Sequence, residues 1–265
     1  MNLIYQNWTG TLTTEVKNSV KQFKQHASRI GVDYRFDENP NIASKLCKEP
    51  FYYECFNHFF DKTFDAYENI LVVDTDVFVN INNNENIFEE TFSDIGICLE
   101  AHQSELRKKS TSKINTKNDE RWMKIIKKAY DIDLPRTNKG DMKIYNSGVV
   151  LWSRQGIEKA KKIFAPFQEY INLTKSAKLP TFYTLDQMYL HAMMYVAKLQ
   201  ISELDNKWNS FCIHVRDKNN NIILKDYRTK STVFVHNQMK NTNNLQENDY
   251  IDLASKSNNE WNFFK

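Results

Sequence analysis

The stretch of this chain that decides its fold is Ile70-Leu71-Val72-Val73-Asp74-Thr75-Asp76-Val77-Phe78-Val79. Four apolar residues followed by Asp-x-Asp and three more apolar residues predict a buried strand with two acids at its carboxyl end. Residues two apart on a strand point to the same side, so we expect Asp74 and Asp76 to converge while Thr75 faces away. Open α/β sheets bind their ligands outside the carboxyl ends of the strands.

Two carboxylates this close repel each other unless a cation or a shared proton lies between them. A hard divalent metal removes that conflict, because such ions prefer oxygen ligands. The alternative that assigns no function to the two acids is an acidic turn at the end of a strand. Turn carboxylates rarely follow so apolar a run and precede another one, so Asp74 and Asp76 predict a metal or phosphoryl site.

The residues before this stretch alternate between strand and helix patterns. Strands are predicted at 3–5 and 32–36, and helices at 13–27 and 51–67. Followed by the strand at 70–73, they give a β-α-β-α-β order, which is typical of a mainly parallel sheet with helices on both faces. The fold class predicted is therefore α/β, with a mixed but mainly parallel sheet flanked by helices.

The rest of the chain continues the pattern without a linker or an internal repeat. Strands are predicted at 94–100, 145–152, 222–224 and 233–235, and helices at 121–130, 155–170 and 185–196. Residues 102–120 are polar and aperiodic, which predicts a surface loop or a lid that faces the substrate. The polar tail 243–265 closes with Trp261, Phe263 and Phe264, which can dock on the body. We therefore expect one domain over residues 1–265.

Composition excludes several classes of function. Of the 265 residues, 41% are hydrophobic and 13% aromatic, enough for a sizeable core. The net charge of +3 has no domain-wide basic stripe, so no nucleic acid partner is expected. Four cysteines without CxxC spacing, no secretory signal and no apolar run of about 20 residues predict a soluble cytoplasmic protein with no transmembrane segment. Weak peripheral contact with a membrane stays open.

Further polar motifs fall at the predicted strand ends: Asn146-Ser147-Gly148, Asp186-Gln187 and His236. Two carboxylates plus an imidazole suit Mn²⁺ or a similar cation. Together with the Asp-x-Asp run, these segments resemble the GT-A fold glycosyltransferases, especially family 8, the glycogenin and galactosyltransferase-like branch. That family typically has a hydrophobic strand, D-x-D, a strand with N-S-G, a D-Q pair and a late strand ending in His. The match covers 69–79, 145–152, 184–188 and 233–240.

The resemblance implies a metal-dependent glycosyltransferase that moves a sugar from a nucleotide-diphosphate sugar, a UDP-sugar, to a carbohydrate or glycoconjugate acceptor. It implies Mn²⁺ (or Mg²⁺) as the cofactor, with Asp74, Asp76 and His236 as its ligands. The residues implied for the donor nucleotide are Tyr5, Gln6, Asn7, Asp74, Thr75 and Lys240. Those implied for the donor sugar are Asn146, Gly148, Asp186 and Gln187, of which Asp186 and Gln187 are also the catalytic candidates.

The family also implies a mechanism. Its members retain anomeric configuration by same-face attack, in which the leaving diphosphate helps to deprotonate the acceptor, so no protein nucleophile is needed. An inverting relative would need a carboxylate base, for which Glu100 and Asp205 are the candidates. The family's late motif is H-x-x-G-x-x-K-P-W, whereas this chain has His236-Asn237-Gln238-Met239-Lys240, with an earlier lysine. Acceptor choice is expected in 102–120 and the C-terminal tail.

Two alternatives stay open at the level of sequence. A haloacid-dehalogenase-like phosphatase also places D-x-D after an apolar strand, with Asp74 as the nucleophile and Asp76 as the acid or base. That motif normally opens its fold, whereas here two β-α units precede it. The other alternative is an inactive transferase fold that serves as a carbohydrate-binding module.

Overall fold

Two β-sheets form the centre of the computed structural model, which describes residues 1–48, 50–100, 102–110, 112–216, 221–242 and 245–263. The larger sheet has the strand order β2-β1-β3-β6-β5-β7 and the smaller one β4-β10-β8-β9. The strands of the larger sheet are β1 Asn2–Trp8, β2 Asp33–Glu38, β3 Asn69–Val73, β5 Ile95–Leu99, β6 Tyr145–Ser153 and β7 Ile201–Leu204. Those of the smaller sheet are β4 Val77–Val79, β8 Ser210–Arg216, β9 Ile222–Asp226 and β10 Phe234–Gln238.

Strand direction in the larger sheet decides which residues meet at its functional edge. β1 pairs in parallel with β2 and β3, and β5 with β7, whereas β6 runs antiparallel to both β3 and β5. Because β6 is antiparallel to β3, its first residues lie beside the last residues of β3, and Val149 is opposite Val73. The predicted mixed α/β class is confirmed, although only four of the eight strand pairings among the described residues are parallel.

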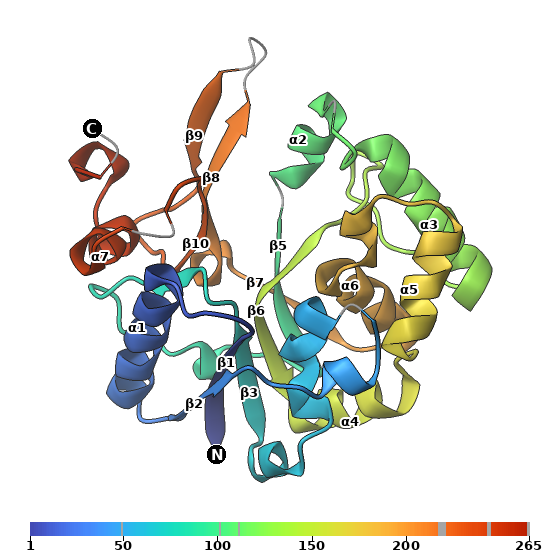
Figure 1. The fold of residues 1–265 in the computed structure, drawn as a ribbon, viewed down its shortest axis with the longest axis horizontal. Helices are drawn as coiled ribbons and strands as arrows, with labels where there is room; N and C mark the ends of the chain where they lie inside the picture. The colour runs from blue at the N-terminus through green and yellow to red at the C-terminus, as the bar shows by residue number, and fades with distance from the viewer. Residues whose placement is uncertain (49, 101, 111, 217–220, 243–244, 264–265) are drawn as a thin grey trace.

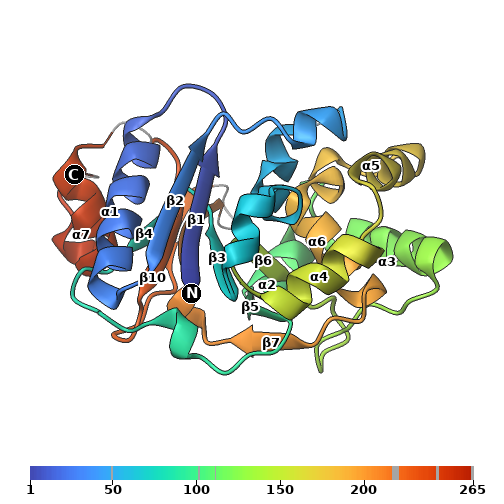
Figure 2. The same ribbon diagram turned by 90° about the horizontal axis from the view of Figure 1, so that it is seen from below.

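Helices cover both faces of the larger sheet (Figures 1 and 2). They are α1 Thr14–Ile30, α2 Gln103–Lys109, α3 Thr116–Tyr130, α4 Arg154–Ile163, α5 Phe167–Ser176, α6 Asp186–Val196 and α7 Glu247–Ser255. Side chains alternate across β3: Ile70 and Val72 pack into the cluster under the helices α3 to α6, and Leu71 and Val73 into the cluster shared with α1 and the smaller sheet. This alternation is the two-residue period of a strand buried on both faces.

The predicted helix over 51–67 is wrong. The chain instead forms two 3₁₀ helices, η2 Pro50–Phe59 and η3 Lys62–Ala66. Side chains three apart eclipse one another in a 3₁₀ helix, and Tyr53, Phe56 and Phe59 follow that spacing into the core. The aromatic spacing of three therefore favoured the tighter helix.

The predicted helix over 155–170 is also wrong, because it is two helices. α4 ends at Ile163 and α5 begins at Phe167, with Pro166 as the residue before α5. Proline has no backbone N–H and its ring clashes with the preceding helical turn, so the chain bends there. Strands β7 and β8 were not predicted from the sequence.

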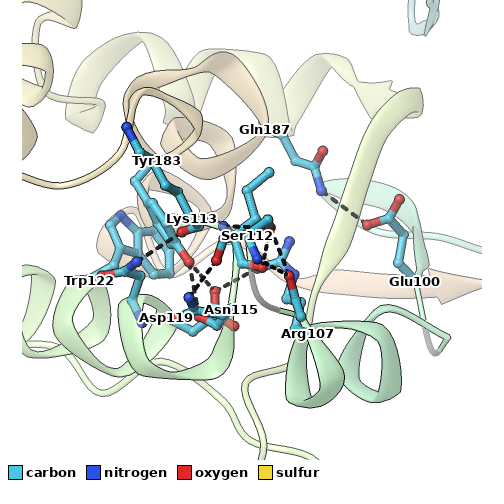
Figure 3. Close-up of polar contacts among 12 residues, drawn as sticks. Glu100, Arg107, Ser112, Lys113, Asn115, Asp119, Trp122, Tyr183 and Gln187 are labelled. Atoms are coloured by element: carbon cyan, nitrogen blue, oxygen red, sulfur yellow. Dashed lines mark hydrogen bonds and ion pairs between the residues drawn. The ribbon is translucent and has the colours of Figure 1, made fainter. Parts of the chain in front are cut away.

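The segment 102–120 is largely helical, contrary to the predicted loop. Its described residues contain α2 and the first turn of α3, joined by the buried ion pair of Arg107 and Asp119 at 2.6 Å. Tyr183 Oη also donates to Asp119 at 2.7 Å, which ties both helices to the residues before α6 (Figure 3). Polar residues here face one another, and this is why the apolar periodicity is weak.

The C-terminal tail contains helix α7, which packs against the outer face of the smaller sheet through Tyr250 and Leu253. Trp261 is buried there, under the guanidinium of Arg228. Phe263 packs beside it, and Phe264 lies outside the described residues. Within the described ranges, none of the helices combines the length and the apolar character needed to cross a membrane.

Candidate active site

The two acids of the Asp-x-Asp run converge because the chain turns, and not because a strand continues through them. β3 ends at Val73 and β4 begins at Val77 in the other sheet, with a turn between them. The N–H of Val77 donates to the carbonyl of Asp74 at 3.3 Å and closes this turn. The expected strand geometry was wrong at these residues, but their neighbourhood is the predicted edge of the sheet.

His236 reaches the same turn from the smaller sheet. β10 is antiparallel to β4 and places His236 opposite Val77, so the imidazole Nε2 lies 3.3 Å from Asp76 Oδ1. One ligand atom from each of Asp74, Asp76 and His236 lies within 4.8 Å of the others. Two segments that are distant in the sequence, the turn after β3 and the strand β10, thus present two carboxylates and one imidazole at a single point.

The residues at this point fit a divalent cation. Asp76 Oδ1 is buried and its contact is the ion pair with His236 Nε2 at 3.3 Å, with no further hydrogen bond to satisfy this carboxylate oxygen. A cation bound between the three side chains would satisfy that oxygen. Two carboxylate oxygens and an imidazole nitrogen form a donor set that suits Mn²⁺ or Mg²⁺.

The electrostatics of the metal-free site reflect crowded negative charge. Burial, and then the charges of Asp76 and Asp186, raise the pKa of Asp74 well above its usual value. Burial alone would lower the pKa of His236, but the charges of Asp76, Asp74 and Glu100 outweigh it and raise this pKa to about 9. Protons are therefore held where a metal cation would otherwise balance the charge.

A cavity of about 350 Å³ opens beside the acids. Its lining residues are Asn7, Trp8, Thr9, Glu15, Val16, Phe51, Tyr52, Cys55, Asp74, Thr75, Asp76 and Asp186. Among the other residues proposed from the sequence, Asn7, Thr75 and Asp186 also line the cavity, whereas Gln187 does not. The cavity is large enough for part of a nucleotide-sized ligand, and such sites are typically concave.

Tyr5 and Gln6 do not line the cavity. The Tyr5 ring is fully buried and meets the Phe64 ring edge-on at 4.8 Å. Gln6 is also fully buried, and its Nε2 donates to the carbonyl of Asp74 at 3.2 Å and to Ser19 Oγ at 2.9 Å. Gln6 thus holds the backbone of the acidic turn, while the direct nucleotide contact predicted for the two side chains stays a prediction.

Asn146 and Gly148 lie beneath the metal site. Asn146 is buried, and its Nδ2 donates to Glu100 Oε1 at 2.9 Å. A Cβ on Gly148 would fall 2.5 Å from His236 Cε1, so only glycine leaves room for the ring. The carbonyl of Gly148 accepts the N–H of Asp74 at 2.9 Å. The motif thus supports the acidic turn and the histidine together.

Asp186 and Gln187 open helix α6 and point in different directions. Asp186 Oδ2 accepts a hydrogen bond from Ser147 Oγ at 3.0 Å, and burial raises the pKa of Asp186 to about 6. Gln187 Nε2 donates to the carbonyl of Tyr145 at 2.9 Å and to Glu100 Oε2 at 3.3 Å (Figure 3). Asp186 therefore faces the cavity, and Gln187 joins the buried polar group around Glu100.

Lys240 follows β10 by two residues. Its backbone N–H donates to His214 Nδ1 at 3.1 Å, and its side chain is exposed. It does not line the cavity beside the acids. Contact with a diphosphate stays a prediction for this lysine.

Several residues at the site were not found from the sequence. Glu15 resembles an ordinary first-turn acid of α1, yet it lines the cavity and accepts a hydrogen bond from Asn237 at 2.7 Å. Phe51 and Trp8 meet edge-on at 6.0 Å on another side of the cavity. Asn209, which contacts His236 at 3.1 Å, precedes a strand that carried no clear sequence signal.

Comparison with known proteins gives a likeness of fold. No protein-family model matches the chain, and no curated protein sequence matches it. Solved structures of glycosyltransferases align with it. Galactosyltransferase LgtC, solved with donor and acceptor sugar analogues, aligns over 96% of this chain and 95% of its own, with 11% identity and a TM-score of 0.51.

Two further structures align more loosely. A glycosyltransferase involved in glycosylation of the major capsid of PBCV-1 covers 96% of this chain and 98% of its own, at 13% identity and a TM-score of 0.46. The catalytic domain of Drosophila β1,4-galactosyltransferase 7 with xylobiose covers 78% and 66%, at 10% identity and a TM-score of 0.37. At 11% identity the likeness to LgtC shows the fold alone, and this fold is of the GT-A glycosyltransferase type.

Proposed function

We propose that this protein is a metal-dependent glycosyltransferase that transfers a sugar from a UDP-sugar to a carbohydrate or glycoconjugate acceptor. The observation that carries the proposal is the meeting of Asp74, Asp76 and His236 at one point, with the two acids on the wall of a cavity. The fold shared with LgtC, a galactosyltransferase solved with donor and acceptor sugar analogues, supports it.

The chain's own residues would divide the work as follows. Asp74, Asp76 and His236 hold Mn²⁺ or Mg²⁺, which when bound supplies positive charge to the diphosphate of the donor. Asn7 and Thr75 lie on the cavity wall where a nucleotide would rest. Asp186, fixed by Ser147 at the N-terminus of α6, can accept hydrogen bonds from hydroxyl groups of the donor sugar.

Transfer with retention of configuration is the mechanism we propose, in line with the family that the sequence resembles. The two cavity acids outside the metal cluster are already engaged, Glu15 by Asn237 and Asp186 by Ser147. Glu100 is buried and accepts hydrogen bonds from Asn146 and Gln187, which commits it to a structural network. Positioning and charge stabilisation are then the protein's main contributions to the rate. Lys240 remains our candidate partner for the departing diphosphate.

The proposal is tested by release of UDP from a panel of UDP-sugars with Mn²⁺, with and without a chelator. We expect release that the chelator abolishes and that falls at least about 100-fold in Asp76→Asn, because the variant loses a metal ligand. Asp131→Asn is the matched control: it makes the same chemical change at the end of α3 and should leave release unchanged.

The alternatives predict other results. A phosphatase would hydrolyse phosphate esters without needing any sugar nucleotide and would lose that activity in Asp74→Asn. A binding module would bind sugars or nucleotide without turnover in either variant. Indifference of the wild-type protein to every nucleotide sugar would contradict the proposal.

A further inference from the structure

The imidazole of His236 is held on three sides. The ring of Phe211 stacks on it with centroids 4.9 Å apart and planes 27° apart. Gly148 contacts its edge, since a Cβ there would fall 2.8 Å from Nδ1. Asn209 Oδ1 lies 3.1 Å from the same Nδ1. The plane and the rotation of the ring are therefore set before any metal binds.

A chain of hydrogen bonds also decides which ring nitrogen carries the hydrogen in the neutral imidazole, the form that binds a metal. It begins at the backbone N–H of Gly148, which can only donate, so the atom of Asn146 that it contacts at 2.8 Å is the oxygen. Asn209 contacts that same oxygen at 2.7 Å, so it must donate there with its NH₂ group. The remaining atom of Asn209 is its oxygen, and it faces His236 Nδ1. Nδ1 therefore carries a hydrogen.

This leaves Nε2 as the metal-facing nitrogen. Nε2 points at Asp76 Oδ1, 3.3 Å away, within the candidate metal site. In metal sites, a hydrogen bond to the far nitrogen of a histidine fixes its tautomer and orientation, and its loss typically lowers metal affinity. We propose that Asn209 is a positioning residue for the metal site, which holds His236 through Nδ1–H with Nε2 aimed at the cation.

The backbone that carries the Asn209 side chain is held firmly by the fold. Asn209 is fully buried between the 3₁₀ helix η6 Asn206–Trp208 and β8, and its N–H donates to the carbonyl of Asn206 at 3.0 Å. β8 pairs in parallel with β10, with Phe211 opposite His236. Asn209 and Phe211 thus come from one strand end and restrain the same ring from two directions.

Two substitutions distinguish the hydrogen bond of Asn209 to His236 from the space that the Asn209 side chain fills in the core. Asn209→Leu keeps the approximate size of the side chain and removes both its hydrogen bonds. Asn209→Asp also loses the bond to Asn146, because a carboxylate cannot donate to the Asn146 oxygen, but it keeps an acceptor for Nδ1–H. Both variants lose the bond to Asn146, so a difference between them reports the acceptor for Nδ1–H together with the negative charge that the aspartate adds.

The first measurement is the affinity for Mn²⁺ without any sugar nucleotide, from the electron paramagnetic resonance signal of the free ion. Asn209→Leu should bind Mn²⁺ about 10- to 100-fold more weakly than wild type, the usual effect of losing such a partner. Asn209→Asp should stay within about threefold of wild type. Equal losses in the two variants, or no loss in Asn209→Leu, would overturn the proposal.

The second measurement does not need a metal. In ¹⁵N-labelled metal-free protein, the Nδ1–H of His236 should give a signal protected from exchange in wild type and in Asn209→Asp. Its absence in wild type would overturn the assignment even if Asn209→Leu failed to fold. Asn80→Leu removes a bond to the carbonyl of Thr232 in the same part of the fold and should leave the signal in place.

The inference rests on the proposed function only for the identity of the cation. Failure of the glycosyltransferase proposal would show as no UDP release with Mn²⁺ still bound, and it would leave the Asn209 result standing. Failure of the Asn209 proposal would show as unchanged affinity for Mn²⁺ in a protein that still turns over. The two outcomes are therefore distinguishable.

Discussion

At the scale of single residues, the site brings together carboxylates whose negative charges repel one another in the metal-free protein. Asp74 and Asp76 meet beside Asp186, and a single imidazole faces them. Such an arrangement is costly to folding and useful for binding, a combination that is common at functional sites.

Neutralising one acid should therefore stabilise the metal-free protein. In Asp74→Asn, the repulsion and the burial of charge that raise the pKa of Asp74 disappear. We expect the free energy of unfolding at pH 8 without metal to rise by about 1–2 kcal/mol, while Mn²⁺ affinity falls at least about tenfold. Urea unfolding with and without Mn²⁺ measures both effects. A metal-free variant less stable than wild type would show that existing contacts already satisfy this carboxylate.

Gly148 should be intolerant of any side chain. Gly148→Ala would drive a Cβ to 2.5 Å from His236 Cε1 and displace the ring, so Mn²⁺ affinity should drop at least about tenfold, with a loss of about 1–3 kcal/mol in stability. Gly96→Ala, also in a central strand, meets only the side chain of Leu204, at 3.1 Å. This control should leave Mn²⁺ affinity unchanged, and an equal loss of affinity in both variants would contradict the role of Gly148.

At the scale of elements, helices α2 and α3 are joined to the functional edge by buried charge. Arg107 and Asp119 are both at least 95% buried, and the guanidinium also lies over the Phe182 ring, 5.0 Å from its centroid. Phe182 and Tyr183 precede Asp186 by only a few residues. The segment expected to be a surface loop or a lid is thus anchored by this pair to the residues that precede α6.

Removing one partner of this pair should be strongly destabilising. Arg107→Met leaves Asp119 buried beside Tyr183 without its cation, and we expect a loss of about 3–5 kcal/mol in chemical unfolding. Arg107→Met combined with Asp119→Leu should lose less than the single variant, because no unpaired charge remains. Arg136→Met breaks an exposed pair with Glu120 and should change stability by less than about 1 kcal/mol. A double variant as unstable as the single one would show that packing, and not charge, dominates.

At the scale of the whole molecule, stability should depend on pH through the site. A raised pKa in the folded state means that His236 stabilises the metal-free fold fully below its ordinary pKa of 6.5, and that this contribution is lost as the pH rises through about 9. The raised pKa of Asp74 acts in the same direction, because the folded state binds its proton more tightly. A bound cation replaces these protons.

The stabilisation by Mg²⁺ should therefore grow with pH. We expect the increase in melting temperature caused by saturating Mg²⁺ to be larger at pH 9 than at pH 6.5, because ligand binding stabilises the state that binds it and protons compete less at high pH. Calorimetry at both values measures the increase, and Asp76→Asn should lose most of it. A Mg²⁺ effect that is equal at both pH values would show that proton release is not linked to metal binding.

The local patterns of the sequence predicted much of the fold. The apolar runs at 70–73 and 145–152 became β3 and β6, and the 3.6-residue periodicity of α1 is visible in its buried residues. Helix α6 is instead buried over the consecutive residues 188–194. Prediction failed where other interactions outweighed it: aromatic packing at 51–67 formed 3₁₀ helices, and buried ion pairing ordered 102–120. Strands β7 and β8 are short or half-exposed and gave no clear alternation.

The sequence by itself determined the fold class and the chemical types at the site: two acids after an apolar run, a late histidine after another, and an Asn-Ser-Gly segment between them. These depend on local apolar patterning and on residue identity, which need no knowledge of distant contacts. The tertiary structure alone decided how the acids converge, through a turn between two sheets, and which groups hold His236. Asn209 and Phe211 reach that ring only because β8 pairs with β10, and such pairing over a distance leaves no mark in a local pattern.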